Sequence, residues 1–112
     1  MKTANIYSEL EYKENKPAIN VMFKTNFTKE IRIVFKKGQV MKEHKTSYPI
    51  VVELCDGTLD FGVNGEVLHL VRGDLIALDG SVPHDLVATE DCVVRLTLTM
   101  SDTEKRVEKV VE

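Results

Sequence analysis

The stretch GDLIALDGSVPHDL, residues 73–86, places a short apolar run, a polar bend and a histidine in immediate succession. Gly73 precedes the apolar run, and a bend at residues 79–81 ends it. Side chains alternate along a strand, so His84 and Leu86 share a face of the run that follows. The stretch predicts two strands joined by a tight connection. His84 is therefore either a candidate metal ligand or a residue that only ends a turn.

The rest of the chain repeats this pattern of short runs separated by turns. Such runs, spaced about 8–12 residues apart, are typical of a β-sandwich or β-barrel. The Asn64–Gly65 pair is the strongest hairpin signal, because a type I′ turn needs positive φ at both central residues. An all-β chain must hide its sheet faces by packing two sheets or closing a barrel. The other runs are AINVMFK (18–24), EIRIVFK (30–36), PIVVEL (49–54), TLDFGV (58–63), EVLHLV (66–71) and CVVRLTLTM (92–100).

Length and composition predict one domain spanning residues 1–112. The chain is 43% hydrophobic and 29% charged, as in ordinary globular proteins. The net charge of −3 argues against nucleic-acid binding, which needs a basic face. No apolar run approaches the roughly 20 residues that span a membrane, and the polar N-terminus does not resemble a signal peptide. The expected location is therefore cytoplasmic, where Cys55 and Cys92 would be free thiols.

The spacing of glycine and histidine in the middle of the chain resembles the first motif of the cupin superfamily. That motif reads G, five residues, H-x-H, three or four residues, E, six residues, G. The matching segment here is 38–57, with His44 and Thr46 at the two histidine positions and Ile50 at the glutamate position.

The second cupin motif reads G, five residues, P-x-G, two residues, H, three residues, N. The matching segment is 73–88, with Asp79 and Ser81 in place of the proline and glycine and His84 at the histidine position. The resemblance covers about residues 30–100. It implies a small single-domain cupin, an all-β jelly-roll barrel (double-stranded β-helix) made of two antiparallel sheets.

The resemblance also implies a metal site, of which this sequence keeps half. The usual cupin ligands are two histidines and a glutamate from the first motif and one histidine from the second. Only His44 and His84 remain here, because Thr46 and Ile50 replace the other two ligands. Zinc sites need three or four good donors, and a neutral threonine hydroxyl is a poor one. The two histidines could still hold Zn, Fe, Ni or Mn weakly, with water completing the shell.

In the cupin register a pocket opens between these motifs, lined mainly by hydrocarbon. Alternation places Val40, Lys42, His44 and Thr46 on one face of their strand. Glu53 points outward and cannot replace the missing carboxylate. Tyr48 either caps the pocket mouth, where it could hydrogen-bond a ligand, or has a structural role only. The predicted ligand-binding residues are His44, Thr46, Tyr48, Ile50 and His84.

Three functions remain open from the sequence. The first is a small-molecule-binding barrel with at most a weak metal site. The second is a metal-dependent dioxygenase or isomerase in which His44 and His84 hold the ion and Thr46 or Tyr48 positions water or substrate. The third is a metal-free isomerase or lyase with His84 as general base.

Two further expectations concern the ends of the chain. A homodimer is expected, pairing through the strand at residues 18–24, because pairing buries exposed strand edges. The C-terminal segment 101–112 has valines at helical spacing and reads as a short helix, a last strand or a frayed end.

Overall fold

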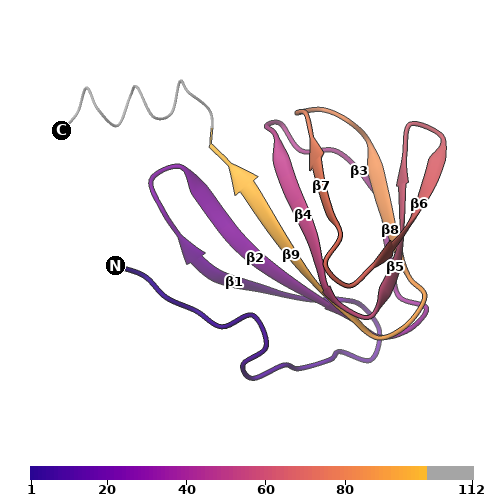
Figure 1. The fold of residues 1–112 in the computed structure, drawn as a ribbon, viewed down its shortest axis with the longest axis horizontal. Coiled ribbons are helices and arrows are strands. Elements are labelled where there is room, and N and C mark those ends of the chain that lie inside the picture. Colours follow the sequence, from indigo (N-terminus) through magenta and orange to yellow (C-terminus); the bar gives the residue numbers. More distant parts are fainter. Residues whose placement is uncertain (101–112) are drawn as a thin grey trace.

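The computed structural model describes residues 1–100, which form nine β-strands and no helix (Figure 1). The C-terminal segment, for which the sequence left three conformations open, lies outside the described residues. Within the described part of the chain, no helix is long and apolar enough to cross a membrane. The strands are β1 (Ala18–Lys24), β2 (Thr28–Phe35), β3 (Val40–His44), β4 (Ile50–Asp56), β5 (Thr58–Val63), β6 (Glu66–Val71), β7 (Leu75–Leu78), β8 (His84–Ala88) and β9 (Cys92–Thr99).

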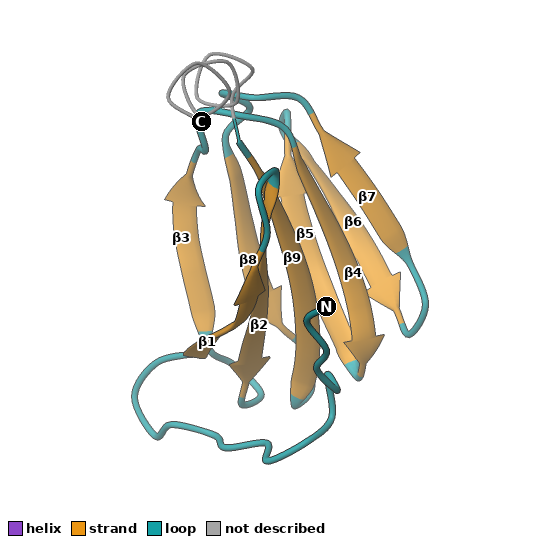
Figure 2. Cartoon of the chain, turned by 90° about the vertical axis from the view of Figure 1, so that its left-hand side faces the viewer, coloured by secondary structure: helices purple, strands orange, loops and turns teal. Residues whose placement is uncertain are grey.

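The strands form two antiparallel sheets that face each other (Figure 2). The larger sheet has the order β1-β2-β9-β4-β7, and the smaller has the order β3-β8-β5-β6. Sequence neighbours therefore often lie in different sheets, as in a jelly roll. The all-β jelly-roll prediction is confirmed.

The hydrophobic core lies between the sheets because the apolar positions of each strand alternate. Phe61 from the small sheet and Phe35 from the large sheet are both fully buried. Burying a side chain of this size contributes roughly 1.5–3 kcal/mol. The core cluster also contains Ile31, Ile33, Ile50, Val52, Leu54, Leu59, Leu70, Leu86, Ala88, Cys92 and Val94.

The β5–β6 hairpin turns at the Asn64–Gly65 pair, as its sequence predicts. Asn64 has φ of 53° and Gly65 has φ of 76°. Val63 and Glu66 pair across the turn, which leaves a loop of two residues. Positive φ at both positions is the type I′ requirement, and it fixes the register of the whole hairpin.

The N-terminal segment crosses the outer face of the large sheet and is held there by Arg32. This guanidinium is buried, with the residue only 5% exposed. Its Nη1 donates hydrogen bonds to the carbonyl oxygens of Ile6 (3.2 Å) and Ser8 (2.6 Å). Its Nε and Nη2 both donate to Asn20 Oδ1. Arg32 therefore ties the segment before β1 to the middle of the sheet.

The same segment buries Cys55, which the alternation places on the outer face with Glu53. Tyr7 donates its hydroxyl hydrogen to the carbonyl oxygen of Cys55 at 2.9 Å, and Cys55 is only 5% exposed. Alternation with Glu53 predicts this outer face for Cys55, and the structure agrees, but the residue is covered. The covering segment has no strand pattern of its own, so its position could not be read from local sequence.

Candidate binding site between two histidines

His44 at the end of β3 and His84 at the start of β8 form a cross-strand pair. Their ring centroids are 4.4 Å apart, and the rings are tilted by 60°. Both strands belong to the small sheet, so the pair lies at the end of the barrel where β3 ends (Figure 2). The structure thus brings together the two histidines that the motif spacing singles out.

A β-bulge in β3 brings His44 to the inner face. Met41 pairs with Leu86 and His44 pairs with His84, so two residues of β3 stand opposite one residue of β8. The extra residue shifts the alternation by one position. Met41 and His44 consequently both line the cavity between the sheets, although His44 is also exposed to solvent, whereas Val40 and Lys42 do not line it. The prediction that Val40 and Lys42 share a face with His44 is therefore wrong.

Backbone carbonyls fix the protonation pattern of both imidazoles. His44 Nδ1 lies 2.8 Å from the oxygen of Lys42, and His84 Nδ1 lies 2.9 Å from the oxygen of Val82. A carbonyl oxygen only accepts hydrogen bonds, so each Nδ1 must carry the hydrogen. In a neutral imidazole the other nitrogen then has a free lone pair. Neither Nε2 has a hydrogen-bond partner within residues 1–100.

His84 is held firmly but is still accessible at one atom. The residue is only 3% exposed, and its ring stacks on Phe61 with centroids 5.6 Å apart and planes 7° apart. Across residues 1–100, no side-chain nitrogen or oxygen is both fully buried and unpartnered. Its unpartnered Nε2 must therefore touch solvent, which makes it available to a ligand.

The cavity beside the two histidines is small. Its volume is about 20 Å³, which is room for one water molecule or one ion. Sites for organic ligands usually measure about 300–1,000 Å³. The barrel interior is therefore almost filled by its own side chains. The cavity is lined by Ile33, Met41, His44, Val52, His84, Leu86, Val94 and Leu96.

The other three predicted binding residues do not line this cavity. Thr46 lies in the loop after β3, where its hydroxyl donates to the carbonyl oxygen of Tyr48 at 3.1 Å. Tyr48 is 38% exposed, and Ile50 is buried in the core. Contact of these three residues with a ligand stays a prediction.

Two loops meet at this end of the barrel in a close backbone approach. The N–H of Ser81 donates to the carbonyl oxygen of Thr46 at 2.7 Å. A Cβ atom added at Gly80 would lie 2.5 Å from the carbonyl oxygen of Ser47, so only glycine fits. Ser81 itself has φ of 66°, a conformation that favours glycine. Ser81 thus adopts a glycine-like backbone at the position where the motif has glycine.

Solved structures share the fold over most of the chain. An RmlC-like cupin protein from Desulfovibrio desulfuricans superposes with a TM-score of 0.82 at 22% identity, covering 88% of this chain and 96% of the other. A conserved protein with a double-stranded β-helix domain from Klebsiella pneumoniae gives 0.81 at 16% identity, with coverages of 91% and 92%. An RmlC-like cupin from Shewanella frigidimarina gives 0.76 at 18% identity, with coverages of 90% and 91%. The chain has the cupin fold.

Comparison with family models and with curated proteins does not show this likeness. No family model matches the chain, and no curated protein matches it. At identities this low the likeness establishes the fold only. What the site does depends on the residues that this chain places in the cupin fold.

The usual four-ligand metal set of the cupin fold does not fit these residues. Residues 1–100 contain no group of three or more histidine, cysteine, aspartate or glutamate side chains that could hold a metal ion. Glu53, the glutamate of β4, faces outward, as predicted. It pairs there with Arg95 at 3.0 Å. The protein therefore offers an ion two imidazole nitrogens. Any remaining donors would have to be water or a bound ligand.

The other reactive residues do not join the site. His69 is on the exposed face of the small sheet, 2.5 Å from Asp60, with its side chain 79% exposed. Its alternation with Leu68 and Leu70 predicts a side chain that faces solvent or an interface, and the exposed fraction agrees with this. Burial, reinforced by nearby carboxylates, raises the pKa of Cys92 to about 12. Burial also raises the pKa of Cys55, so both thiols are poor nucleophiles at neutral pH.

Proposed function

We propose that this protein binds a small molecule at the end of its barrel, with His44 and His84 as the polar contacts. The observation that supports this most directly is the pair of unpartnered Nε2 atoms on adjacent rings. Two neighbouring lone pairs attract a group that donates hydrogen bonds, such as a hydroxyl or an amine. The ligand class is therefore a small polar molecule that carries such a donor.

The small cavity limits how much of the ligand enters the barrel. A volume of about 20 Å³ admits one polar group and excludes a whole organic molecule. The rest of the ligand would lie over the two loops at the barrel end, where Thr46 and Tyr48 are available for contact. Apolar walls around the donor favour a molecule that satisfies both nitrogens, because an unpaired polar group there is costly.

Metal-dependent activity is the second candidate, and one observation favours it. Histidines that bind metals usually donate their other ring N–H to a carboxylate or a carbonyl oxygen. His44 and His84 both have this arrangement, through Lys42 and Val82. Zn, Fe, Ni or Mn held there with water would supply the Lewis acid that an isomerase uses, and a redox-active ion such as Fe would also supply the electron transfer that a dioxygenase needs. The missing third and fourth ligands place this candidate second.

The two candidates are separated by nuclear magnetic resonance of ¹⁵N-histidine-labelled protein. A library of small alcohols and amines is screened, and the Nε2 signals of His44 and His84 are followed. We expect hits that shift both signals and that lose binding in His44→Ala and His84→Ala. His69→Ala is the matched control, because it removes an exposed imidazole far from the pair. Hits that bind the double variant unchanged would refute the proposal, and signal changes with metal salts alone would favour the metal site.

We also infer that the chain forms a homodimer through β1. Ile19 and Val21 pair with Ile33 and Ile31 and so face the barrel side of the large sheet. Yet they are 54% and 55% exposed, so the small sheet does not cover them. β1 is also an edge strand. A second copy that covers this edge would bury both the apolar side chains and the free backbone groups.

A further inference from the structure

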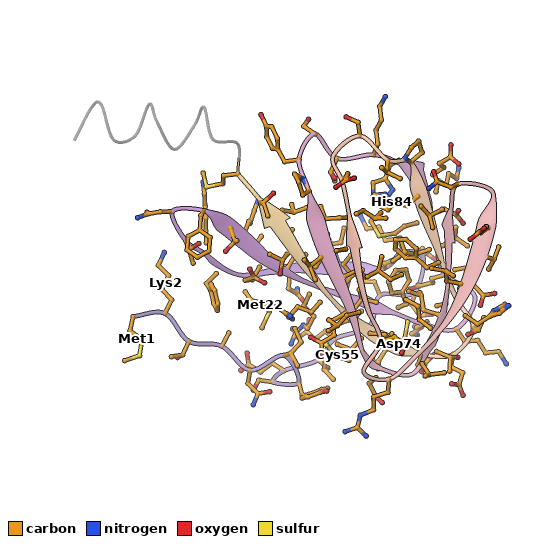
Figure 3. The ribbon with its side chains drawn as sticks, turned by 45° about the horizontal axis from the view of Figure 1, so that its top comes forward. Met1, Lys2, Met22, Cys55, Asp74 and His84 are labelled. Atoms are coloured by element: carbon orange, nitrogen blue, oxygen red, sulfur yellow. The ribbon has the colours of Figure 1, made fainter. Side chains whose placement is uncertain are left out.

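A second hollow, much larger than the cavity beside the histidines, lies on the outer face of the large sheet. Its volume is about 540 Å³, within the usual range for small-molecule sites. It opens between the N-terminal segment and strands β1, β2 and β9. Figure 3 shows Met22, one of its wall residues, on the side of the N-terminal segment and away from His84. The lining residues are Ala4, Ile6, Met22, Phe23, Thr25, Phe27, Thr28, Glu30, Arg95 and Thr97.

The strand register separates this hollow from the barrel interior. Glu30 pairs with Thr97 in the β2–β9 ladder, and the next pair, Ile31 with Leu96, points into the core. Successive side chains of a strand point to opposite faces. Glu30 and Thr97 therefore face away from the histidine pair, and a ligand bound over them would not touch His84.

The walls of the hollow are apolar. Phe23 and Met22 come from β1, Ile6 comes from the N-terminal segment, and Phe27 comes from the β1–β2 turn. Phe27 is 57% exposed, an unusual position for a phenylalanine with no partner among residues 1–100 to cover it. These side chains form an extended apolar surface that the hydrocarbon part of a ligand could contact.

The floor is polar, and its charged residues are Glu30 and Arg95. Arg95 lies between two carboxylates, with Nη1 3.2 Å from Glu30 and Nε 3.0 Å from Glu53. Glu30 Oε1 also accepts a hydrogen bond from Thr97 at 2.5 Å, while its Oε2 has no partner within residues 1–100. Glu53 does not line the hollow, but it shares the Arg95 guanidinium with Glu30, so these three groups together carry one negative charge. The floor therefore complements a cation that can also donate a hydrogen bond.

We propose that this hollow binds an amphipathic amine, with its apolar body against Phe23 and Phe27 and its ammonium group at Glu30. A polar floor beneath apolar walls favours a molecule whose charged group lies on the floor and whose hydrocarbon part lies along the walls. Two lysines belong to the same elements as the walls: Lys2 lies in the N-terminal segment and Lys24 ends β1, and the Lys2 ammonium donates to the carbonyl oxygen of Lys24. These exposed cations would be the contacts of an amphipathic acid, so the test includes one.

The test compares three probes with the same body and different heads: octylamine, octanoate and octanol. Each is titrated into the full chain, and the amide signals of Phe27, Thr28 and Thr97 are followed. We expect octylamine to bind about five- to tenfold more tightly than the other two, since a partly screened ion pair contributes at that level. Tighter binding of octanoate would overturn the charge assignment. No binding of any probe would also overturn the proposal and leave the hollow to a protein occupant, a second copy or residues 101–112.

Three variants tie the result to this site. Glu30→Gln keeps the shape of the floor and removes the charge, so it should cancel the preference for octylamine. Phe27→Ser should weaken all three probes equally. His84→Ala should change none of them, so this site and the histidine site can fail independently. If Glu30→Gln loses the native amide spectrum, Phe27→Ser still tests the site, because this exposed side chain is outside the core.

Discussion

His44 and His84 face each other across two paired strands, each with its Nδ1 bound to a backbone carbonyl two residues earlier in the chain. The same local contact thus orients both rings and leaves the same atom of each ring unpartnered. The arrangement depends on backbone atoms, so it does not need a neighbouring acid to hold it. What it lacks, compared with a usual cupin metal site, is further donors.

The two-nitrogen site leads to a prediction about metal content. Because the described residues supply no third donor, dialysis against a chelator should leave far less than one metal ion per chain. Added Zn²⁺ should bind with a Kd of roughly micromolar or weaker. Elemental mass spectrometry and calorimetry measure these two quantities. His44→Ala with His84→Ala should abolish binding, and His69→Ala should not. Metal that stays stoichiometric through dialysis would put the enzyme interpretation first.

Ser81 should be a site of easy stabilisation. Its φ of 66° costs energy for any residue with a side chain, and its hydroxyl makes no hydrogen bond within the described residues. Ser81→Gly should raise the free energy of unfolding by about 0.5–1 kcal/mol. Urea unfolding followed by circular dichroism measures the change. Ser47→Gly, on the facing loop at ordinary φ, should have the opposite sign. A lower free energy of unfolding in Ser81→Gly than in the wild type would show that the positive φ of Ser81 does not destabilise the protein.

Stability should fall at alkaline pH partly because of Cys92. Its pKa is raised from 9.0 to about 12, chiefly by burial. Between these values the unfolded chain releases the thiol proton and the folded chain keeps it, so unfolding is favoured as pH rises. The contribution of the protonated Cys92 thiol to the free energy of unfolding is complete below about pH 9. It is lost as the pH rises toward 12, at no more than about 1.4 kcal/mol per pH unit.

Cys92→Ala supplies the measurement for that effect. Urea unfolding across this pH range should give a shallower decline in the variant than in the wild type, whatever the variant's overall stability. Cys55 and Tyr12, whose pKa values are also raised by burial, titrate in both proteins and cancel in the comparison. Parallel declines would mean that Cys92 ionises as easily in the folded chain as in the unfolded one.

A charge placed on β1 should disrupt the homodimer. Val21→Glu introduces a carboxylate at the proposed interface and should convert the dimer to a monomer in light scattering after size exclusion. Val67→Glu is the matched control, because Val67 is a strand valine of similar exposure, 58% against 55%, on the small sheet. A wild type that is monomeric at all concentrations, or a dimer broken only by Val67→Glu, would exclude pairing through β1.

Strand positions could be predicted because their determinants are local. Alternation and turn chemistry are visible in the sequence, and the Asn64–Gly65 turn fixes its hairpin without help from the rest of the chain. The closeness of His44 and His84 is implied by the resemblance to the two cupin motifs. Three features were not visible. The bulge before His44 depends on pairing with β8, Arg32 looks like an exposed strand residue until the N-terminal segment covers it, and the cavity volume depends on side chains from both sheets.

The two imidazoles belong to one sheet, while Ile33, Val52, Val94 and Leu96 on the opposite wall of their cavity belong to the other. Spacing between the nitrogens is therefore set by hydrogen bonds within a single ladder, and room for an occupant is set by the gap between layers. The size and the polarity of this site can consequently change independently. Shortening a large-sheet side chain such as Leu96 would admit a bulkier ligand, and the geometry of the polar pair that recognises it would stay the same.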